Sequence, residues 1–469
     1  MLTLIVTSHA LLRAAMRSAL QRRAGRLCLL GLFAVLSAVA PLPAAEPDAA
    51  RPNVVLIISD DHAWTDYSFM GHRQARTPNI DRLAGEGLTF TRGYVSTAIC
   101  SPSLATMLTG LHAHQHGITG NDPVVAGGTS ADAARDAFLR PFLKRPQLPQ
   151  LLRDSGYLTM HTGKFWMRDP KRVGFTHDMG PTGRHGGAAL AIGRETMAPI
   201  DAFIDEAIAA DKPFFLWYAP FLPHLPHNPP SRLLDKYADV PDGEEAKYLA
   251  MVEWLDETVG TLLASLDKKG VTRNTLVLYL ADNGWNEYGK AFPYENGVRT
   301  PIIARWPAVI APRVDSKNLA SNLDVLPTLL SACSVAPPAD LPGIDLLDAE
   351  AVADRREIFL ANFAHDMIAH DAPEKSLWTR SVIRDHWKLI EWQDPPPAIL
   401  PYNGGHRRKS FDAPPPDGQL ADALRHVELF DLLADPHETQ NLAAANGPKV
   451  RQLQAAIDRW WNPPEQKKK

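Results

Sequence analysis

Three apolar runs constrain the fold of this chain more than any other feature of its sequence. The runs "NVVLIISDD" at 53–61 and "TLVLYLADNG" at 275–284 contain several consecutive β-branched or other apolar residues, and a third run lies at 213–224. Such runs are typical of strands buried on both faces in a parallel sheet. Helical patterns separate them at 78–87, 147–156, 200–210 and 244–269. This alternation predicts an α/β fold with a mostly parallel central sheet flanked by helices.

The pattern changes after residue 342, and a chain of 469 residues is long enough for a second, smaller unit. Short strand-like pieces, a proline-rich connection and a last helix follow at 357–361, 379–384, 387–392, 394–417 and 448–461. We therefore predict a large α/β domain over residues 51–345 and a small C-terminal α+β subdomain over residues 355–462.

Residues 1–45 are typical of a signal peptide. Arg22, Arg23 and Arg26 precede an apolar run at 27–40, and small residues follow it. The run is short for a membrane span, so we expect an exported protein, periplasmic or secreted, with no stable span after signal removal; an uncleaved anchor is the alternative. The formal net charge is −4, and no basic block except the tail at 467–469 suggests a nucleic-acid partner.

Two cysteines remain after the signal, Cys100 and Cys333. An oxidising compartment would allow them to form a disulfide, and composition alone favours such a bond, or a buried thiol, for Cys100. The surrounding segment "CSPSLATMLTG" offers another interpretation. Ser101 can cap a helix, Pro102 suits its first turn and Gly110 suits its end. The N-terminus of such a helix would attract an anion.

Acidic residues follow both long apolar runs: Asp60 and Asp61 end the first, and Asp282 and Asn283 end the second. The carboxyl ends of parallel strands meet at one edge of a sheet, so these side chains should converge. Hard oxygen ligands favour Ca²⁺ or Mg²⁺ over zinc. Singly, each pair could be a cap or a simple turn. Together, and beside the helix start at Cys100, they predict a site for a sulfate or phosphate ester.

Several segments carry a resemblance to a known family. They are "CSPSLATMLTG", the opening "RPNVVLIISDDHAWTDYSFMGH", and then "LADNG", "KAFPYENGVRTPIIARWP" and "ELFDLLADPHETQNLA". In this order they resemble the formylglycine-dependent sulfatases of the alkaline-phosphatase-like superfamily, in which the cysteine of C-x-P-S-R is oxidised to an aldehyde. The likeness extends from residue 51 to about residue 445 and implies the family's fold, with the large α/β domain as the catalytic one.

The resemblance implies a role for each candidate site residue. One divalent cation, usually Ca²⁺ although Mg²⁺ is an alternative, would be bound by Asp60, Asp61, Asp282, Asn283 and the modified Cys100. Lys164 in "TGKFW" and Lys290 in "KAFPYENG" match lysines that bind sulfate. His224 in "PHLPH" matches a histidine near the leaving-group oxygen, and His227 is a further candidate for substrate contact. Either histidine could instead simply pack in its proline-rich loop.

The chemistry implied by the resemblance explains these residue types. A hydrated aldehyde derived from Cys100 offers one hydroxyl to attack sulfur and a second whose deprotonation releases sulfate. The cation would lower the pKa of the attacking hydroxyl, Lys164 and Lys290 would stabilise developing negative charge, and His224 could protonate the leaving alkoxide. The expected partners are a small-molecule or glycan sulfate ester and a maturation enzyme that generates formylglycine.

Two positions depart from the family pattern. Leu104 stands where the signature has arginine, and Trp166 stands where the usual lysine-x-histidine has histidine. Arg92, His116 and Arg184 are candidates to supply the missing functions. The favoured function is a sulfatase acting on a sulfated sugar. A phosphate or phosphonate ester hydrolase with the same site and a non-catalytic relative that binds sulfated glycans are the alternatives.

Overall fold

The computed structural model describes residues 51–125, 127–180, 185–285, 289–393 and 427–464. The predicted signal at 1–45 and the proline-rich connection at 394–417 lie outside these residues. The chain from Ala50 onward forms one compact unit. Among the described residues, no helix has the length and apolar character that crossing a membrane would require.

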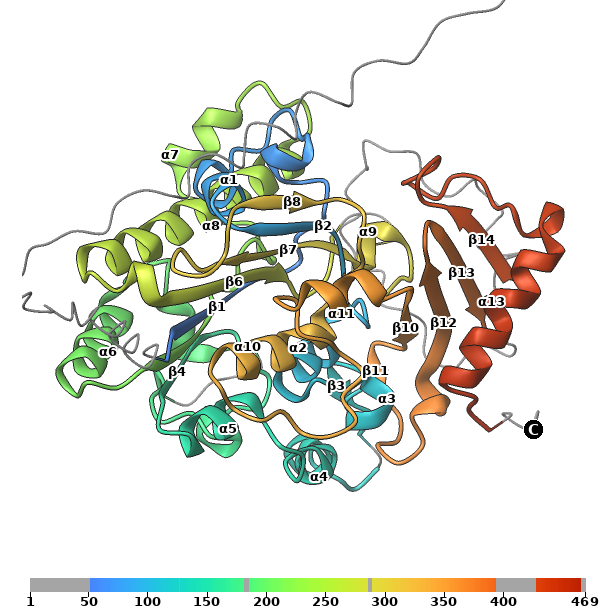
Figure 1. The fold of residues 1–469 in the computed structure, drawn as a ribbon, viewed down its shortest axis with the longest axis horizontal. Coiled ribbons are helices and arrows are strands. Elements are labelled where there is room, and N and C mark those ends of the chain that lie inside the picture. The colour runs from blue at the N-terminus through green and yellow to red at the C-terminus, as the bar shows by residue number, and fades with distance from the viewer. Residues whose placement is uncertain (1–50, 126, 181–184, 286–288, 394–426, 465–469) are drawn as a thin grey trace, which may run out of the picture. The chain divides into compact units, whose positions relative to one another are not determined.

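A central sheet has the strand order β4-β5-β1-β6-β7-β2-β8, and the short strand β9 pairs with β2 (Figure 1). Its four strands β4, β5, β1 and β6 are all parallel and have the bounds Leu158–Gly163, Phe214–Ala219, Asn53–Ser59 and Thr275–Ala281. Strand β7, Arg299–Arg305, is antiparallel to β6 and to β2, Leu88–Tyr94. The short strands β8, Arg313–Asp315, and β9, Ala320–Ser321, are both parallel to β2. The predicted mostly parallel α/β sheet is confirmed.

Helices cover both faces of this sheet, and strand β1 shows why. Its alternate residues Val55 and Ile57 belong to one buried cluster, and Val54, Leu56 and Ile58 belong to the other. The first cluster includes side chains of α1, α6 and α8, which are Pro78–Gly85, Ala198–Ala209 and Gly243–Lys268. The second includes those of α2, α4, α5 and α10, which are Cys100–Thr109, Ala131–Phe142, Leu148–Asp154 and Val325–Ala332.

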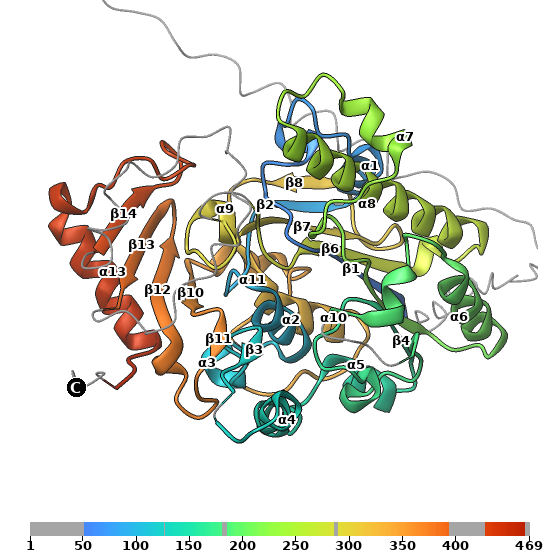
Figure 2. The same cartoon turned by 180° about the vertical axis from the view of Figure 1, so that it is seen from behind.

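The C-terminal part contains a four-stranded antiparallel sheet, visible beside helix α13 in Figure 2. Its strands β10, β12, β13 and β14 are Glu357–Phe363, Leu377–Arg384, Trp387–Trp392 and Val427–Asp431. One face packs on α13, Gly447–Trp460, through Leu453 and Ile457. The other face packs on residues of the central sheet and its loops, including Tyr94 and Val298. Hydrophobic burial therefore fixes this sheet against the region where strands β2 and β7 begin or end.

Short elements complete the described chain. They are α3, α7, α9 and α11 at Ala113–His116, Ser231–Leu234, Glu295–Val298 and Ala349–Asp354, and the two-stranded pair β3 and β11 at Asp122–Pro123 and Asp366–Met367. The third apolar run is a strand only as far as Ala219. Beyond it the chain forms a loop, because Pro220, Pro223 and Pro226 lack the backbone N–H that a central strand needs; the peptide bonds before Pro223 and Pro226 are cis.

Candidate active site

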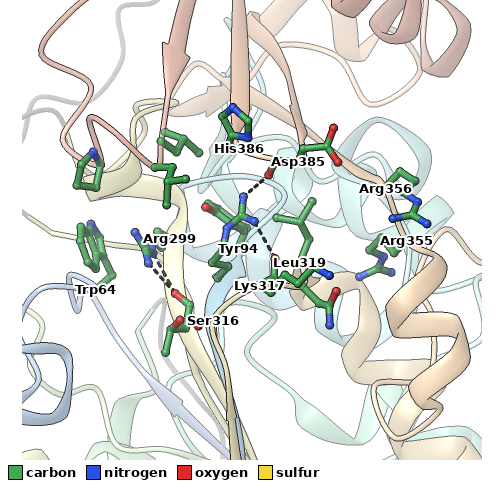
Figure 3. A pocket seen from close by; sticks show the side chains of 16 residues that line it. Trp64, Tyr94, Arg299, Ser316, Lys317, Leu319, Arg355, Arg356, Asp385 and His386 are labelled. Carbon is green, nitrogen blue, oxygen red and sulfur yellow. Dashed lines mark hydrogen bonds between the residues drawn. The ribbon is translucent and has the colours of Figure 1, made fainter.

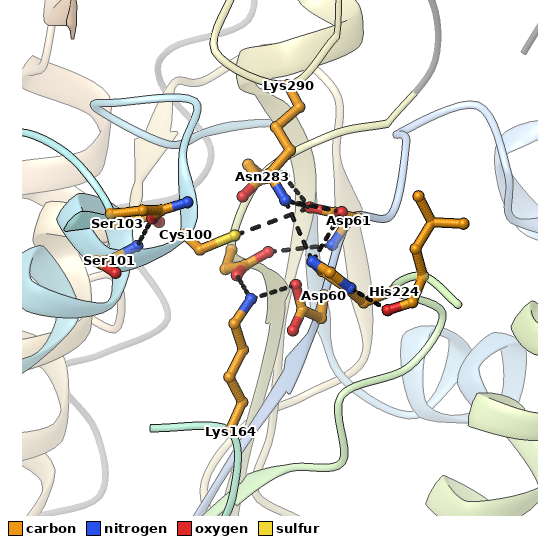
Figure 4. Close-up of polar contacts among 12 residues, drawn as sticks. Asp60, Asp61, Cys100, Ser101, Ser103, Lys164, His224, Asn283 and Lys290 are labelled. Carbon is orange, nitrogen blue, oxygen red and sulfur yellow. Dashed lines mark hydrogen bonds and ion pairs between the residues drawn. The ribbon is translucent and has the colours of Figure 1, made fainter. Parts of the chain in front are cut away.

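The four polar residues at the ends of β1 and β6 lie together. Ser59 and Ala281 are register partners in these parallel strands, so the residues that follow them emerge side by side. The backbone N–H of Asp61 donates to Asp282 Oδ1 over 3.2 Å, and Asn283 Nδ2 donates to Asp61 Oδ1 over 2.7 Å. Asp60 lies beside Asp61 and completes the group (Figure 4). All four side chains are buried. The structure brings the predicted metal ligands to one edge of the sheet.

Asp61 adopts a left-handed backbone conformation, with φ of 56°. Aspartate tolerates this region better than most residues. Neighbouring hydrogen bonds hold the turn: Tyr248 donates its hydroxyl to the Asp61 carbonyl over 3.2 Å, and the Asp60 N–H donates to the Leu222 carbonyl over 2.9 Å. Such a constrained conformation at a turn between a strand and a buried polar cluster is common at functional sites.

Two buried lysines point into the carboxylate group. Lys164, directly after β4, places Nζ 2.6 Å from Asp60 Oδ1 and 3.4 Å from Asp282 Oδ2. Lys290 places Nζ 2.8 Å from Asp61 Oδ1 and 2.9 Å from Asp61 Oδ2. Burial alone would lower the pKa of both ammonium groups, but the surrounding carboxylates raise both above the ordinary value. Both lysines are therefore charged in the site.

The carboxylates have unequal environments. Burial, together with the negative charge of Asp282, raises the pKa of Asp60 well above its ordinary value. Burial also raises the pKa of Asp282. Burial would do the same for Asp61, but the charges of Lys290, His224 and Lys164 lower its pKa below the usual range. Lys164 offsets only part of this effect at Asp60 and Asp282, so both carboxyl groups remain short of positive charge.

A divalent cation fits this deficit. Asp60 Oδ2 and Asn283 Oδ1 are buried and have no hydrogen-bond partner among the described residues, which is costly unless an unrepresented group meets them. Ligand atoms of Asp60, Asp61, Cys100 and His224 lie within 4.8 Å of one another. With Asp282 and Asn283 beside this group, carboxylate and amide oxygens outnumber the sulfur and nitrogen atoms, and they suit a hard cation such as Ca²⁺ or Mg²⁺.

Cys100 is the first residue of helix α2, which begins two positions earlier than a cap at Ser101 would imply. Ile99 is the N-cap and accepts from the Ser103 N–H, so the predicted cap at Ser101 is wrong. Cys100 Sγ lies 3.9 Å from Asp61 Oδ1. Only 3% of Cys100 is exposed, and burial raises the pKa of its thiol to about 12. An unmodified thiol here would stay protonated at neutral pH.

The disulfide interpretation of Cys100 is also wrong, because both Cys100 and Cys333 are free and buried. Cys333 is the C-cap of α10 and bonds Tyr157, whose hydroxyl donates to the Pro52 carbonyl just before β1. The carboxylates follow the other end of β1, so the pairing that composition suggested does not form.

A cavity of about 190 Å³ opens beside Cys100. Four predicted site residues line it, namely Cys100, Lys164, His224 and Lys290. Its other polar lining residues include Ser101, Asn121, His185 and His365, which were not predicted as part of the site. Asn121 Oδ1 accepts from the Ser101 N–H over 3.0 Å, and the Asn121 N–H donates to the His365 carbonyl over 2.8 Å. His365 lies here because β3 pairs with β11. The two strands are more than two hundred residues apart in the sequence, so no local pattern predicts this contact.

The two predicted histidines have different positions. His224 Nε2 lies 3.4 Å from Asp61 Oδ2 and 3.3 Å from Lys290 Nζ, and its Nδ1 lies 2.6 Å from the Leu225 carbonyl. Burial is the main reason why the pKa of His224 is well below its ordinary value. His227 instead packs against the rings of Tyr248 and Trp285, at centroid distances of 5.4 and 5.8 Å, and is not among the residues that line the cavity.

The two residues that depart from the family pattern lie in different surroundings. Leu104 is 1% exposed within the core, whereas Trp166 lines the cavity at Cys100. His116 is buried against Phe142 and bonds Thr106, and Arg92 lies in a different cavity, so neither of these candidate replacements lines the site. Arg184 lies outside the described residues. The histidines that do line the cavity are His185, His224 and His365.

A buried ion network holds the loop that carries Lys290. Lys388 of β13, which is 0% exposed, lies 3.1 Å from Glu295 Oε1 and 2.8 Å from Glu438 Oε1. Tyr94 donates its hydroxyl to Glu295 Oε2 over 3.1 Å. Glu295 begins α9, and within α9 the Gly297 carbonyl accepts from the Gly284 N–H over 2.8 Å, next to Asn283. The C-terminal sheet therefore fixes α9, and α9 fixes the loop that follows β6.

We expect Lys388→Met to lower the free energy of unfolding by about 3–5 kcal/mol, because its removal leaves buried Glu438 without a counter-charge and leaves Glu295 only the more distant Arg299, at 3.6 Å. Lys247→Met is the matched control, since Lys247 pairs with Glu244 at the surface and should cost about 1 kcal/mol or less. Guanidinium unfolding of both variants measures the difference. Equal, small losses in the two variants would show that the network contributes little.

Comparisons with known proteins agree with this geometry. The family model described as Sulfatase matches residues 52–335, and that described as N-sulphoglucosamine sulphohydrolase, C-terminal, matches residues 282–398. The chain is 30% identical to N-acetylgalactosamine-6-sulfatase of Mus musculus over 67% of this chain and 69% of the relative. It is 32% identical to arylsulfatase A of Homo sapiens over 66% and 69%, respectively.

Solved structures share the fold. A sulfatase from Pseudoalteromonas sp. superposes with a TM-score of 0.62 at 22% identity, over 87% of this chain and 90% of that one. A phosphonate monoester hydrolase of Agrobacterium radiobacter superposes with a TM-score of 0.64 at 18% identity, over 87% and 95%. Because a sulfatase and a phosphonate monoester hydrolase both share this fold, structural similarity does not distinguish the two activities, whereas the sequence matches do.

Proposed function

Because the chain belongs to the sulfatase family and is a sulfuric ester hydrolase, we propose that it hydrolyses the sulfate ester of a sulfated sugar with a formylglycine formed from Cys100 and one divalent cation. The mouse relative is named for a sulfated sugar, N-acetylgalactosamine 6-sulfate. The cavity at Cys100, with two lysines and three histidines in its lining, suits an anionic group attached to a hydroxylated leaving group.

One observation carries the proposal. Cys100 lies at the first position of α2 and faces the buried group of Asp61, Lys164 and Lys290 in one cavity. A buried cysteine placed only for packing would not need ionised neighbours of both signs. A nucleophile that must attack an anionic ester does need them, because cationic donors must offset the charge of the ester as it reacts.

Each side chain then has a defined task. The hydrated formylglycine would supply the attacking oxygen, and the cation would lower the pKa of that hydroxyl. Lys164 and Lys290 would orient the sulfate oxygens. The Nδ1–H of His224 bonds the Leu225 carbonyl, so Nε2 is the nitrogen that would carry a proton to the leaving-group oxygen, and the negative charge of a bound sulfate ester would favour that protonated form. His227 is proposed as an outer contact for the substrate, from the same loop.

Asp60, Asp61, Asp282 and Asn283, with the modified Cys100, are the proposed ligands of the cation, and Ca²⁺ is preferred over Mg²⁺. We expect elemental analysis to find about one Ca²⁺ or Mg²⁺ per chain after mild dialysis, and none in Asp60→Ala. A bound ion stabilises the folded state by mass action, so added Ca²⁺ should raise the melting temperature of the wild-type chain but not that of Asp60→Ala. Asp201→Ala, in helix α6 away from the site, is the control and should respond as the wild type does. Zinc alone, or no metal in a folded chain, would contradict this assignment.

Turnover of paired aryl esters tests the reaction itself. With the same leaving group, we expect kcat/KM for the sulfate to exceed that for the phosphonate by at least about tenfold, an advantage of about 1.4 kcal/mol in transition-state binding. A reversed ratio would favour the phosphonate hydrolase, whose fold the chain shares. Absence of turnover on both esters, with binding of sulfated glycans retained, would favour a non-catalytic role.

The remaining assignments concern the whole chain. We propose a catalytic domain over 51–345, a C-terminal subdomain over 355–462 and a signal peptide over 1–45 that directs export to the periplasm or outside the cell. A formylglycine-generating enzyme would be the partner that modifies Cys100. Amino-terminal sequencing of protein secreted by the expressing cell tests the signal: an intact start at Met1 would count against cleavage.

A further inference from the structure

A second cavity, of about 540 Å³, has no lining residue in common with the cavity at Cys100 (Figure 3). It lies where the end of the central sheet meets the turn between β12 and β13. Most of its charged lining residues are positive. Asp385 is the single carboxylate, and the five cationic side chains are those of Arg92, Arg299, Lys317, Arg355 and Arg356. The chain as a whole carries a formal net charge of −4, so this positive concentration is local.

Some of these cations already have a structural task. Arg355 donates to both carboxylate oxygens of Asp324 over 2.5 and 2.6 Å, so its charge is neutralised. Arg299 bonds the Thr91 carbonyl over 2.9 and 3.0 Å and covers the Trp64 ring at 3.9 Å. These two arginines therefore form part of the cavity wall, and their N–H groups are already used in contacts within the protein.

The other three cations keep their charge. Arg92 donates to the backbone carbonyls of Lys317, over 2.8 Å, and Asp385; carbonyls are neutral, so they orient the guanidinium without cancelling it. Lys317 and Arg356 are exposed and have no carboxylate partner among the described residues. They reach the cavity from different parts of the chain, one after β8 and one before β10.

We propose that this second cavity is an exosite that binds an additional anionic group, a sulfate or a carboxylate, on a polymeric sulfated glycan. The inference rests on the proposed function, since it assigns the substrate as a chain of sugars rather than a single one. The volume suits a sugar-sized group, and Asp385 offers an acceptor for a sugar hydroxyl beside the cationic donors. Local cations on a net-negative protein would also attract a polyanion and speed its association.

Charge reversal of the two unpaired cations tests the exosite. In a Cys100→Ala background, which prevents turnover, Lys317→Glu/Arg356→Glu should raise the Kd of a sulfated hexasaccharide at least about tenfold in calorimetry at low salt. Its Kd for the sulfated monosaccharide should change less than about twofold. Lys144→Glu/Lys212→Glu is the matched control, because these exposed lysines lie elsewhere and impose the same change of net charge. The control should leave both Kd values within about twofold.

Kinetics separates this inference from the proposed function. With Cys100 intact, the double variant should hydrolyse a small aryl sulfate with unchanged kcat while KM for the hexasaccharide rises. Failure of the wild-type chain to hydrolyse any sulfate ester would sink the proposed function, and the calorimetry would still test binding. Equal hexasaccharide affinity in the double variant and the control, or equally strong binding of a DNA oligonucleotide that the double variant also loses, would overturn the glycan exosite. If the double variant is unfolded by circular dichroism, Lys317→Gln gives the same comparison.

Discussion

Cys100→Ala should abolish sulfate ester hydrolysis down to the uncatalysed background, while the protein remains folded. The substitution removes the atom that would become the nucleophile, and no other side chain in the described lining of the cavity can replace a hydrated aldehyde. Loss of a buried thiol by itself should not have this effect. Cys333→Ala therefore makes a matched control, since Cys333 is also free and buried but lies away from the carboxylates.

The state of Cys100 gives a second, independent measurement. Protein expressed with a maturation enzyme should yield a Cys100 peptide that reacts with an aldehyde probe in mass spectrometry. Leu104 makes this a demanding test, because the family's arginine is absent there. In the folded protein Leu104 is part of the core, so any effect it has on maturation must arise before folding. A fully active enzyme whose peptide carries only unmodified thiol would exclude formylglycine here.

The sequence predicted those parts of the fold and the site that follow from local patterns. Strands β1 and β6 lie within the two long apolar runs, and the acidic residues directly after them meet because parallel neighbours end together. For these residues, periodicity and position at a strand end contain the necessary information. Lys164 also follows a strand of this sheet, but that strand was not predicted, and only the family resemblance indicated the residue.

Other parts depend on contacts that no local pattern encodes. His365 reaches the cavity only because β11 pairs with β3, and His185 is near His224 because of how two loops fold back, with their ring centroids 5.7 Å apart. The sequence suggested a disulfide because cysteine count carries no distance information. Helix α2 begins at Cys100 because Ile99, in extended conformation, ends the preceding segment, and capping propensity alone favoured Ser101.

The C-terminal subdomain contributes to the site in a way that its own sequence does not indicate. Lys388 and Glu438 bind Glu295, and the same stretch returns to the site through the Ala291 N–H, which donates to the Ala98 carbonyl over 2.6 Å, two residues before Cys100. Lys290 lies between these anchors. Its position is therefore set by packing against a second sheet as well as by the carboxylates, which is the kind of outer support that precise catalytic geometry requires.

Lys290→Ala should consequently lower kcat by about 10²-fold or more, the usual cost of removing one preorganised cationic donor. Stability should fall less, because Lys164 remains as a cation near Asp61, Asn283 keeps its hydrogen bond to Asp61, and the backbone anchors at Ala291 and Glu295 remain. Steady-state kinetics and thermal unfolding of Lys290→Ala measure the two effects. Lys290→Arg should recover part of kcat, and Lys247→Ala, at an exposed surface pair, should change neither quantity. An unchanged kcat with a large fall in melting temperature would mean that Lys290 only holds Asp61 in place and does not act on the ester.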